Sequence, residues 1–310
     1  MTPILQLEEV RYTYPGNAEP ALRGANLSLW GGKKIAVLGR NGSGKSTLFL
    51  HCNGILRPDG GQLYLAGKPV KYDRGSLLGL RRHVGIVFQN PDDQLFSASV
   101  VQDMSFGPLN LGLSQVEASR RVEEAAEQCE IVDLLDRPTH ALSGGQKARV
   151  ALAGVLAMEP SVILVDEVMA SLDPWMRDQI LSILHDFAAR GRTVVLATHD
   201  LALARTWADL VAVMEGGRVL AVDTPDVIFS SEAMLAHLGP RSAWFYPPLR
   251  SASEAALAPQ GDRATKPVAP AVPAPVDGPL CEPLTVPTER NPHSNGSGNV
   301  HADLGKMTQR

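Results

Sequence analysis

The stretch GRNGSGKST, residues 39–47, has the residue types and spacing of a loop that binds phosphate groups. It follows the apolar run KIAVL and opens the run STLFLHCNG, so it lies where a strand passes into a helix. Glycines let backbone N–H groups wrap the phosphates, Lys45 supplies charge to the outer phosphates, and the Ser46 hydroxyl can bind Mg²⁺. The predicted site comprises Gly39, Arg40, Asn41, Gly42, Ser43, Gly44, Lys45, Ser46 and Thr47.

Other apolar runs end in residues suited to the hydrolysis of a bound phosphate ester. Asp166 ends the run SVILVD and can hold Mg²⁺ through water, and Glu167 can polarise an attacking water as a general base. His199 follows TVVLAT and can contact the terminal phosphate. Gln89 ends HVGIVFQ and can contact both Mg²⁺ and the water. Because parallel strands end at one edge of a sheet, we expect these side chains to lie near the phosphate loop.

A tyrosine near the N-terminus is a candidate for stacking on a nucleotide base. Tyr14, early in the chain in RYTYPG, is the preferred residue for stacking through the face of its ring, and Tyr12 is the alternative.

A second helix start with bare backbone N–H groups occurs in ALSGGQKARVALAG. Ser143, Gly144 and Gly145 stand where a helix begins, and Gln146 follows. The N-terminus of a helix attracts anions through its free N–H groups and its dipole. The chain therefore has two helix starts suited to phosphate, which a single site does not explain.

Short apolar runs predict the sheet that positions these residues. KIAVLG, HVGIVFQ, SVILVDE and TVVLATH are typical of buried strands in a largely parallel sheet. ANLSLW alternates apolar residues at Ala25, Leu27 and Leu29, which indicates a half-buried strand. VAVMEGGRVLAVD predicts a hairpin that turns at Gly216 and Gly217.

Helix signals fill the segments between these runs. Ser114 and Glu117 predict a capping box. The predicted helix after it has an apolar face made of Ala118, Val122, Ala125, Cys129 and Val132. Asp173 and Pro174 predict the N-cap and first residue of another helix. Residues 89–154 show no convincing strand, so we expect a helical insert between two strands.

Composition limits the classes of protein and partner. The 310 residues allow one large domain or two modest ones, and the net charge of −4 argues against a nucleic-acid partner. Cys52, Cys129 and Cys281 form no CxxC pair, so we expect reduced thiols. No secretion signal and no membrane-spanning run is evident. Residues 1–245 are expected to form the folded domain, and the Pro/Ala-rich residues 246–310 a disordered tail.

Together these motifs resemble the ATP-binding-cassette (ABC) ATPases over nearly all of the first 245 residues. GRNGSGKST resembles the Walker A loop, LSGGQ the family signature, VILVDE the Walker B strand and SLD, residues 171–173, the D-loop. Gln89 and His199 match the Q-loop glutamine and the switch histidine. The resemblance implies an α/β P-loop NTPase fold with a RecA-like core, an N-terminal antiparallel β subdomain and an inserted α-helical subdomain at about 90–155. It also implies an ATPase that uses ATP and Mg²⁺.

The resemblance explains the second helix start. In this family the signature of one subunit closes over the ATP held by the Walker A loop of the other. Ser143, Gly144, Gly145 and Gln146 are thus expected to contact nucleotide held by a second copy, and Asp173 of the D-loop is assigned to the same site. One motif set per chain favours a homodimer. The family usually has proline after the catalytic glutamate, and Val168 in that place puts the posture of Glu167 in question.

The segment VGIVFQNPDDQLFSASVVQDMSFGPLNLGLS resembles the ATPases of energy-coupling-factor importers, and with HCNGILRPDGG it is most similar to those of cobalt importers. That implies a transmembrane coupling subunit and a substrate-binding membrane subunit as partners, at the cytoplasmic face of the cell membrane. Residues 89–96 and the helical insert are expected to form a groove for a helix of the coupling subunit. Asp92, Asp93 and Leu95 are expected to matter for coupling. The alternatives are a nickel or vitamin importer, or an ABC ATPase that transports nothing.

Overall fold

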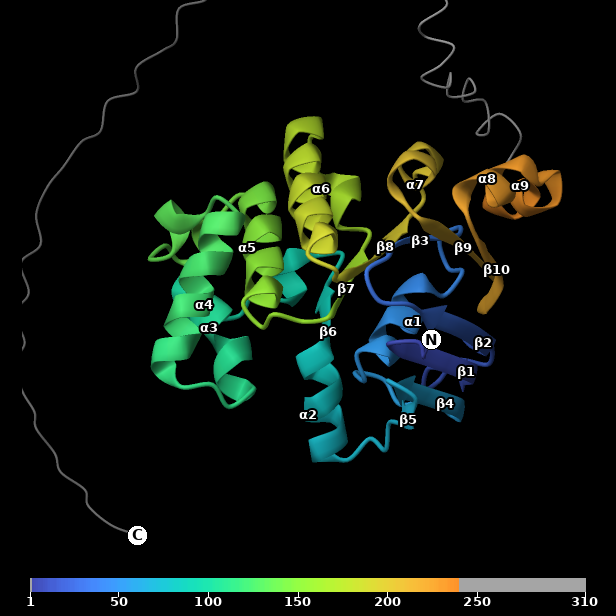
Figure 1. Ribbon diagram of the computed structural model, residues 1–310, viewed down its shortest axis with the longest axis horizontal. Helices are drawn as coiled ribbons and strands as arrows, with labels where there is room; N and C mark the ends of the chain where they lie inside the picture. The colour runs from blue at the N-terminus through green and yellow to red at the C-terminus, as the bar shows by residue number, and fades with distance from the viewer. Residues whose placement is uncertain (1, 240–310) are drawn as a thin grey trace, which may run out of the picture. The chain divides into compact units, whose positions relative to one another are not determined.

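The computed structural model describes residues 2–239, which form two sheets and a set of helices (Figure 1). The predicted tail, residues 246–310, and Cys281 lie outside the described residues. The strands are β1 (Leu5–Tyr12), β2 (Leu22–Leu29), β3 (Lys34–Leu38), β4 (Gly60–Leu65), β5 (Lys68–Pro69), β6 (Val84–Val87), β7 (Val162–Asp166), β8 (Thr193–Thr198), β9 (Leu210–Glu215) and β10 (Arg218–Asp223). The α-helices are α1 (Lys45–Cys52), α2 (Arg74–His83), α3 (Val100–Asn110), α4 (Gln115–Gln128), α5 (Gly144–Leu156), α6 (Pro174–Ala189), α7 (Leu201–Trp207), α8 (Pro225–Ser230) and α9 (Glu232–Leu238). Short 3-10 helices are η1 (Pro91–Asp93), η2 (Val132–Leu134), η3 (Thr139–Ala141) and η4 (Val168–Ser171).

The larger sheet has the order β10-β9-β3-β8-β7-β6 and is parallel except for its edge strand β10. All four apolar runs predicted as buried strands lie in it, as β3, β6, β7 and β8, which confirms that prediction. The predicted hairpin is also confirmed, because β9 and β10 pair antiparallel around Gly216 and Gly217, both with positive φ. Strand β6 pairs with β7 in a register that sets Val87 opposite Val165.

A second, antiparallel sheet has the order β2-β1-β4-β5. The predicted alternation in β2 is confirmed, since Ala25, Leu27 and Leu29 are all buried. Leu48 and Phe49 of α1 are buried in one core cluster with residues of both sheets. The packing of α1 against both sheets fixes the direction in which its first turn, at the phosphate loop, points.

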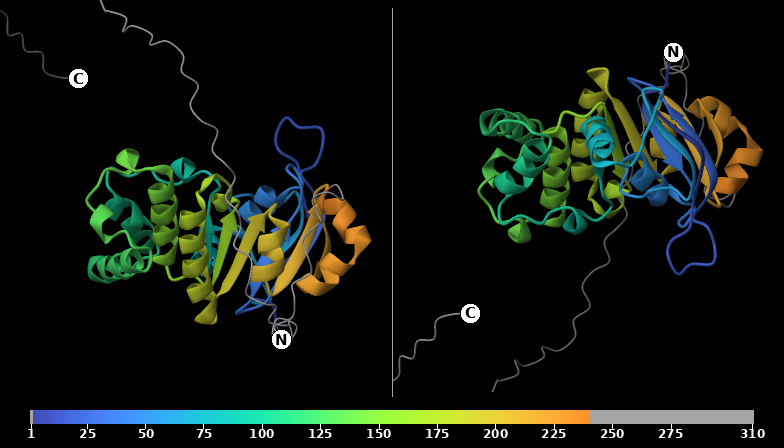
Figure 2. Two further views of the ribbon diagram at one scale, coloured as in Figure 1. Left: turned by 90° about the horizontal axis from the view of Figure 1, so that it is seen from above. Right: turned by 90° about the horizontal axis from the view of Figure 1, so that it is seen from below.

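Helices α3, α4 and α5 lie between β6 and β7 in sequence and form a group beside the larger sheet (Figures 1 and 2). No strand occurs in residues 89–154, all of which are described, so the prediction of a helical insert is confirmed. Ala118, Val122, Ala125 and Cys129 are buried as predicted. Val132 was placed wrongly on this face: it is 54% exposed. The reason is that α4 ends at Gln128, beyond which the helical periodicity does not hold.

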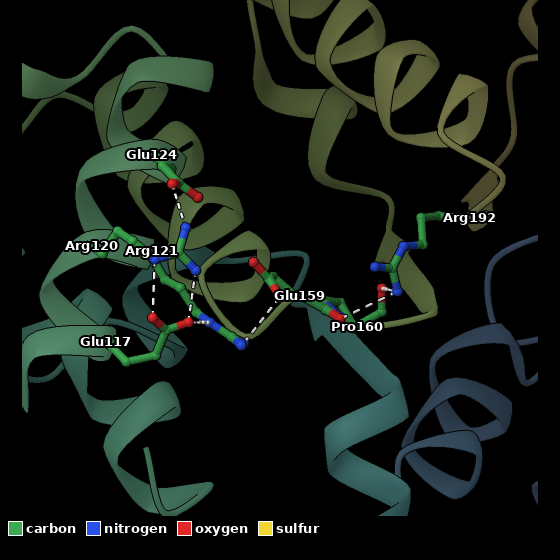
Figure 3. Close-up of polar contacts among 7 residues, drawn as sticks. All are labelled: Glu117, Arg120, Arg121, Glu124, Glu159, Pro160 and Arg192. Atoms are coloured by element: carbon green, nitrogen blue, oxygen red, sulfur yellow. Dashed lines mark hydrogen bonds and ion pairs between the residues drawn. The ribbon is translucent and has the colours of Figure 1, made fainter. Parts of the chain in front are cut away.

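The predicted capping box at Ser114 forms only in part. Ser114 Oγ accepts a hydrogen bond from the backbone N–H of Glu117 at 3.2 Å, which is the expected N-cap. The Glu117 carboxylate, however, binds Arg120 at 2.7 Å and Arg121 at 2.8 Å (Figure 3). Arg121 also pairs with Glu159 at 3.2 Å, just before β7. The glutamate therefore joins an ion network that connects α4 to the start of a sheet strand.

None of the helices within residues 2–239 is long and apolar enough to cross a membrane.

Candidate functional site

The phosphate loop connects β3 to α1, and its backbone conformation and close packing leave no room for side chains at some of its glycines. Gly42 and Gly44 have φ of 79° and 103°, a region that glycine enters without strain. A Cβ atom on Gly39 would lie 2.4 Å from the backbone oxygen of Met214. The loop therefore needs glycine both for its turns and for its close approach to β9.

Lys45, the first residue of α1, is held by oxygen atoms on three sides. Its Nζ donates to the backbone oxygens of Gly39 at 2.8 Å and Arg40 at 3.2 Å. It also pairs with Glu167 Oε1 at 3.0 Å, and the two side chains are only 4% and 11% exposed. A buried ammonium with this orientation is a preformed anchor for anionic groups that compete with the Glu167 carboxylate.

Asp166 ends β7 and is buried, and its Oδ1 atom has no hydrogen-bond partner among the described residues. Burial raises the pKa of its carboxyl group, while the Ser46 hydroxyl acts in the opposite direction. An unsatisfied buried carboxylate oxygen costs stability unless a ligand uses it. Together with a hydroxyl group it forms the hard oxygen donor set that Mg²⁺ prefers, so these residues fit a Mg²⁺ ion.

Glu167 lies between the phosphate loop and the switch position. Its φ of 47° places it in the left-handed region, and it is the N-cap of η4. Its Oε2 atom lies 4.0 Å from His199 Nδ1, whereas its Oε1 atom contacts Lys45. His199 is 62% exposed, so it can reach a ligand from the solvent side. Val168 is buried in the core below this turn.

A hollow of about 400 Å³ lies over the phosphate loop. Its lining comprises Tyr14, Ala21, Asn41, Gly42, Gly44, Lys45, Ser46, Thr47, Gln89 and Glu167. The predicted side chains from three strand ends and the N-terminal segment thus meet at one place. Gly39, Arg40 and Ser43 belong to the loop but do not line the hollow, because two of them bind Lys45 through their backbone and Ser43 is buried beneath it.

Tyr14 and Tyr12 have different surroundings. Tyr14 lines the hollow, and its hydroxyl lies 3.2 Å from Thr47 Oγ1. Tyr12 does not line the hollow and packs against the core instead. Of the two candidates, only Tyr14 is placed to contact a ligand there. Ala21, which also lines the hollow, carries no side-chain signal by which the sequence could have revealed it.

His199 does not line the hollow over Lys45; it lines a second, smaller hollow of about 160 Å³ that shares Glu167 with the first. Arg177 of α6 lies in the same lining and pairs with Asp200, which caps α7. This ion pair connects α6 to the segment that follows β8 and carries His199. Sequence reasoning missed it, because a pair between two helices has no local pattern.

The second helix start lies apart from both hollows within one chain. Ser143 and Gln146 form a reciprocal capping box at the start of α5, which the sequence analysis did not recognise. A Cβ atom added to Gly144 would have nothing within 4 Å. Asp173 is the N-cap of α6 as predicted and accepts a hydrogen bond from the Met176 N–H at 2.9 Å. Neither Asp173 nor residues 143–146 line the hollow over Lys45.

An apolar groove of about 580 Å³ lies between the larger sheet and the helical insert. Its lining includes Phe96 and Phe106, which are 66% and 51% exposed and stack edge to face with ring centres 4.8 Å apart. Gln94 and Phe96 of the predicted stretch 89–96 line it, whereas Asp92, Asp93 and Leu95 do not, and their expected importance for coupling stays a prediction. Asp92 pairs with Lys147 at 2.6 Å, and Leu95 packs against the core of the insert.

Comparisons with known proteins agree with this geometry. A family model described as ABC transporter matches residues 22–170. The cobalt import ATP-binding protein CbiO of Rhodobacter capsulatus is 51% identical over 241 residues, which cover 78% of this chain and 86% of that protein. The energy-coupling factor transporter ATP-binding protein EcfA of Methanocaldococcus jannaschii is 47% identical over 227 residues, which cover 73% and 81%. The structure of CbiO1 from Clostridium perfringens, part of the ABC transporter complex CbiONQ, aligns with a TM-score of 0.66 at 44% identity and covers 76% of this chain and 93% of that one.

Proposed function

Since the chain belongs to the ATP-binding subunits of ABC transporters, in their energy-coupling-factor group, and is therefore an ATPase, we propose that it powers the import of cobalt ions. The observation that carries the catalytic part of this proposal is the buried Lys45–Glu167 pair at the floor of the hollow. It joins the residue that would hold phosphate to the residue that would activate water.

In the proposed reaction, the loop N–H groups and Lys45 hold the phosphates of ATP, and the adenine ring stacks on Tyr14. Because Lys45 then faces the phosphates, the Glu167 carboxylate is free to accept a proton from a water molecule. That water attacks the γ-phosphorus, and the bond to the bridging oxygen breaks to leave ADP and phosphate. His199, whose Nδ1 atom lies 4.0 Å from Glu167 Oε2, would stabilise the γ-phosphate.

Asp166, Ser46 and Gln89 would hold Mg²⁺ in this site. The bound ion would neutralise charge on the phosphate oxygens. The unsatisfied Oδ1 atom of Asp166 and the position of Gln89 in the lining support this assignment.

A second copy of the chain would complete each site. The capping box uses the backbone N–H groups of Ser143 and Gln146, and it leaves those of Gly144 and Gly145 facing outward at the start of α5. Residues 143–146 do not line their own hollow, so in this proposal Ser143, Gly144, Gly145 and Gln146 close on the nucleotide of the partner. Asp173, at the start of α6, would join them from the same copy. Two-fold symmetry would then give two composite sites, and loss of the γ-phosphate would loosen the dimer.

The groove at Phe96 and Phe106 fits a helix of a transmembrane coupling subunit, which itself contacts a substrate-binding membrane subunit. Two exposed phenylalanines in an apolar groove are suited to the apolar face of an amphipathic helix. This partner would place the chain at the cytoplasmic face of the cell membrane. Phe96→Arg or Phe106→Arg should prevent co-purification with the membrane subunits and leave the ATPase activity of the free chain unchanged. Val116→Arg, at an 83% exposed site outside the groove, is the control.

The proposed cargo rests on the similarity to the cobalt import protein, and the similarity to EcfA keeps nickel and vitamin importers as the alternatives. The test is uptake of radioactive cobalt, nickel or a vitamin by cells that express the chain with the membrane subunits encoded beside it. Lys45→Ala should abolish uptake, whereas Lys33→Ala, at an exposed lysine, should not. Nickel or vitamin uptake without cobalt uptake would refute the proposed cargo, and no Lys45-dependent uptake of any of them would refute transport itself.

A further inference from the structure

Four residues form a closed circuit of contacts beside the nucleotide hollow. The Tyr14 hydroxyl lies 3.2 Å from Thr47 Oγ1, and the backbone oxygen of Thr47 lies 2.7 Å from His51 Nδ1, one turn farther along α1. The His51 ring packs edge to face on Tyr12, with ring centres 4.8 Å apart. Tyr12 packs edge to face on Tyr14 at 5.0 Å, which closes the circuit.

His51 is the buried member of this circuit, with 1% of its surface exposed. Burial lowers the pKa of its imidazole, although the Thr47 carbonyl and Asp59 act in the opposite direction. Since a carbonyl oxygen only accepts hydrogen bonds, Nδ1 carries the proton and donates it to Thr47. The Nε2 atom is left without a partner among the described residues. An apolar residue would avoid that cost, so packing alone does not explain a histidine here.

Tyr14 is constrained by this circuit at both of its ends. Its hydroxyl is tied to the phosphate-loop helix, and its ring is tied to Tyr12 at the end of β1. The residues that follow it, at positions 15–19, are exposed. His51 contacts both anchors of Tyr14, Thr47 through a hydrogen bond and Tyr12 through its ring.

We propose that His51 is a positioning residue that fixes the Tyr14 ring for the adenine base. It does so without touching the nucleotide, since it is absent from the lining of the hollow. This inference rests on the proposed stacking of adenine on Tyr14. It predicts that His51 affects recognition of the base and leaves binding of the phosphate groups unchanged.

The test compares the affinities of the full-length chain for Mg-ATPγS and for Mg-tripolyphosphate, which lacks the base, by calorimetry. His51→Leu removes both the hydrogen bond and the polar ring contact. It should weaken ATPγS binding about two- to tenfold, the range expected for loss of an aromatic edge contact, and leave tripolyphosphate binding unchanged. His51→Asn keeps a donor near Nδ1 and His51→Phe keeps a ring against Tyr12, so each should lose only part of this affinity.

Tyr14→Ala separates failure of this inference from failure of the stacking proposal. If Tyr14→Ala leaves ATPγS affinity unchanged, the stacking proposal is wrong and the inference fails with it. If Tyr14→Ala weakens binding but no His51 variant does, only the inference is wrong. Equal weakening of ATPγS and tripolyphosphate by the His51 variants would assign His51 to the stability of α1 and overturn its positioning role. In the double variant of Tyr14→Ala and His51→Leu, the two effects should not add, because both act through the same ring.

Discussion

Replacement of Glu167 by glutamine should separate two effects of its carboxylate. Glu167→Gln removes the proposed general base, so the steady-state rate of ATP hydrolysis should fall by roughly 10²- to 10⁴-fold. The same change removes the negative charge that holds Lys45 at 3.0 Å in a pair that is almost fully buried. The amide oxygen can still accept a hydrogen bond, so only the charge-assisted part, about 1 kcal/mol, is lost. Because ATP no longer competes with a carboxylate for Lys45, the affinity of the variant for ATP should rise about five- to tenfold.

The assay measures the affinity for a non-hydrolysable ATP analogue by calorimetry and phosphate release by a coupled colour reaction. Glu123→Gln, at an exposed glutamate on α4, is the matched control and should change neither quantity. A Glu167→Gln protein that hydrolyses ATP at the wild-type rate would refute the role of Glu167 as the base. Unchanged affinity with lost hydrolysis would refute the competition between ATP and Glu167 for Lys45.

Four further changes test other parts of the site. Val168→Pro should leave the hydrolysis rate within about threefold of wild type, because residue 168 is the first of η4 and a first helical position tolerates proline; a larger loss would show that valine sets the posture of the base. Asp166→Asn should raise the melting temperature of the nucleotide-free chain, because burial raises the pKa of Asp166 and so disfavours its charged form. The difference in melting temperature between variant and wild type should become smaller as the pH falls toward that pKa, because Asp166 is then protonated in the wild type as well. Gly39→Ala should lower the free energy of unfolding by about 1–3 kcal/mol, since its Cβ would lie 2.4 Å from a backbone oxygen, whereas Gly144→Ala should have little effect in urea titrations. Cysteines at the exposed Asn41 and Gly144 should crosslink between copies when ATP is bound and hydrolysis is blocked, and their failure to crosslink would count against the composite site.

The sequence predicted the elements that depend on local patterns. The buried strands β3, β6, β7 and β8 are short apolar runs, and such runs need no knowledge of their neighbours. Strand β1 was expected only through the family resemblance. Its alternation of buried residues is broken between Leu7 and Val10, where Glu9 adopts a positive φ and the pairing register shifts. A bulge of this kind moves later side chains to the other face and hides the strand from a period-two search.

A local residue with positive φ, which interrupts the regular spacing of side chains, also explains the error at Val132. Glu130 adopts a φ of 52° just after α4 ends, so the chain leaves the helical spacing and Ile131 is buried in place of Val132. The predicted residues of the nucleotide hollow came from motifs, whereas their contacts did not. The Lys45–Glu167 pair, the Tyr14–Thr47 contact and the Tyr12–His51 contact join segments far apart in the chain, and no local pattern encodes such contacts.

The pairing register between β6 and β7 brings the groove close to Asp166, the proposed Mg²⁺ ligand. Val87 and Val165 face each other on adjacent strands. Phe88, which lines the groove, directly follows the last residue of β6, and Asp166 is the last residue of β7. A displacement of Phe88 by the proposed membrane partner would therefore reach Asp166, the proposed Mg²⁺ ligand, through the hydrogen bonds between two adjacent strands. Movement of the partner helix and hydrolysis of ATP would then be coupled through one pair of adjacent strands, and a longer path through the rest of the protein would not be needed.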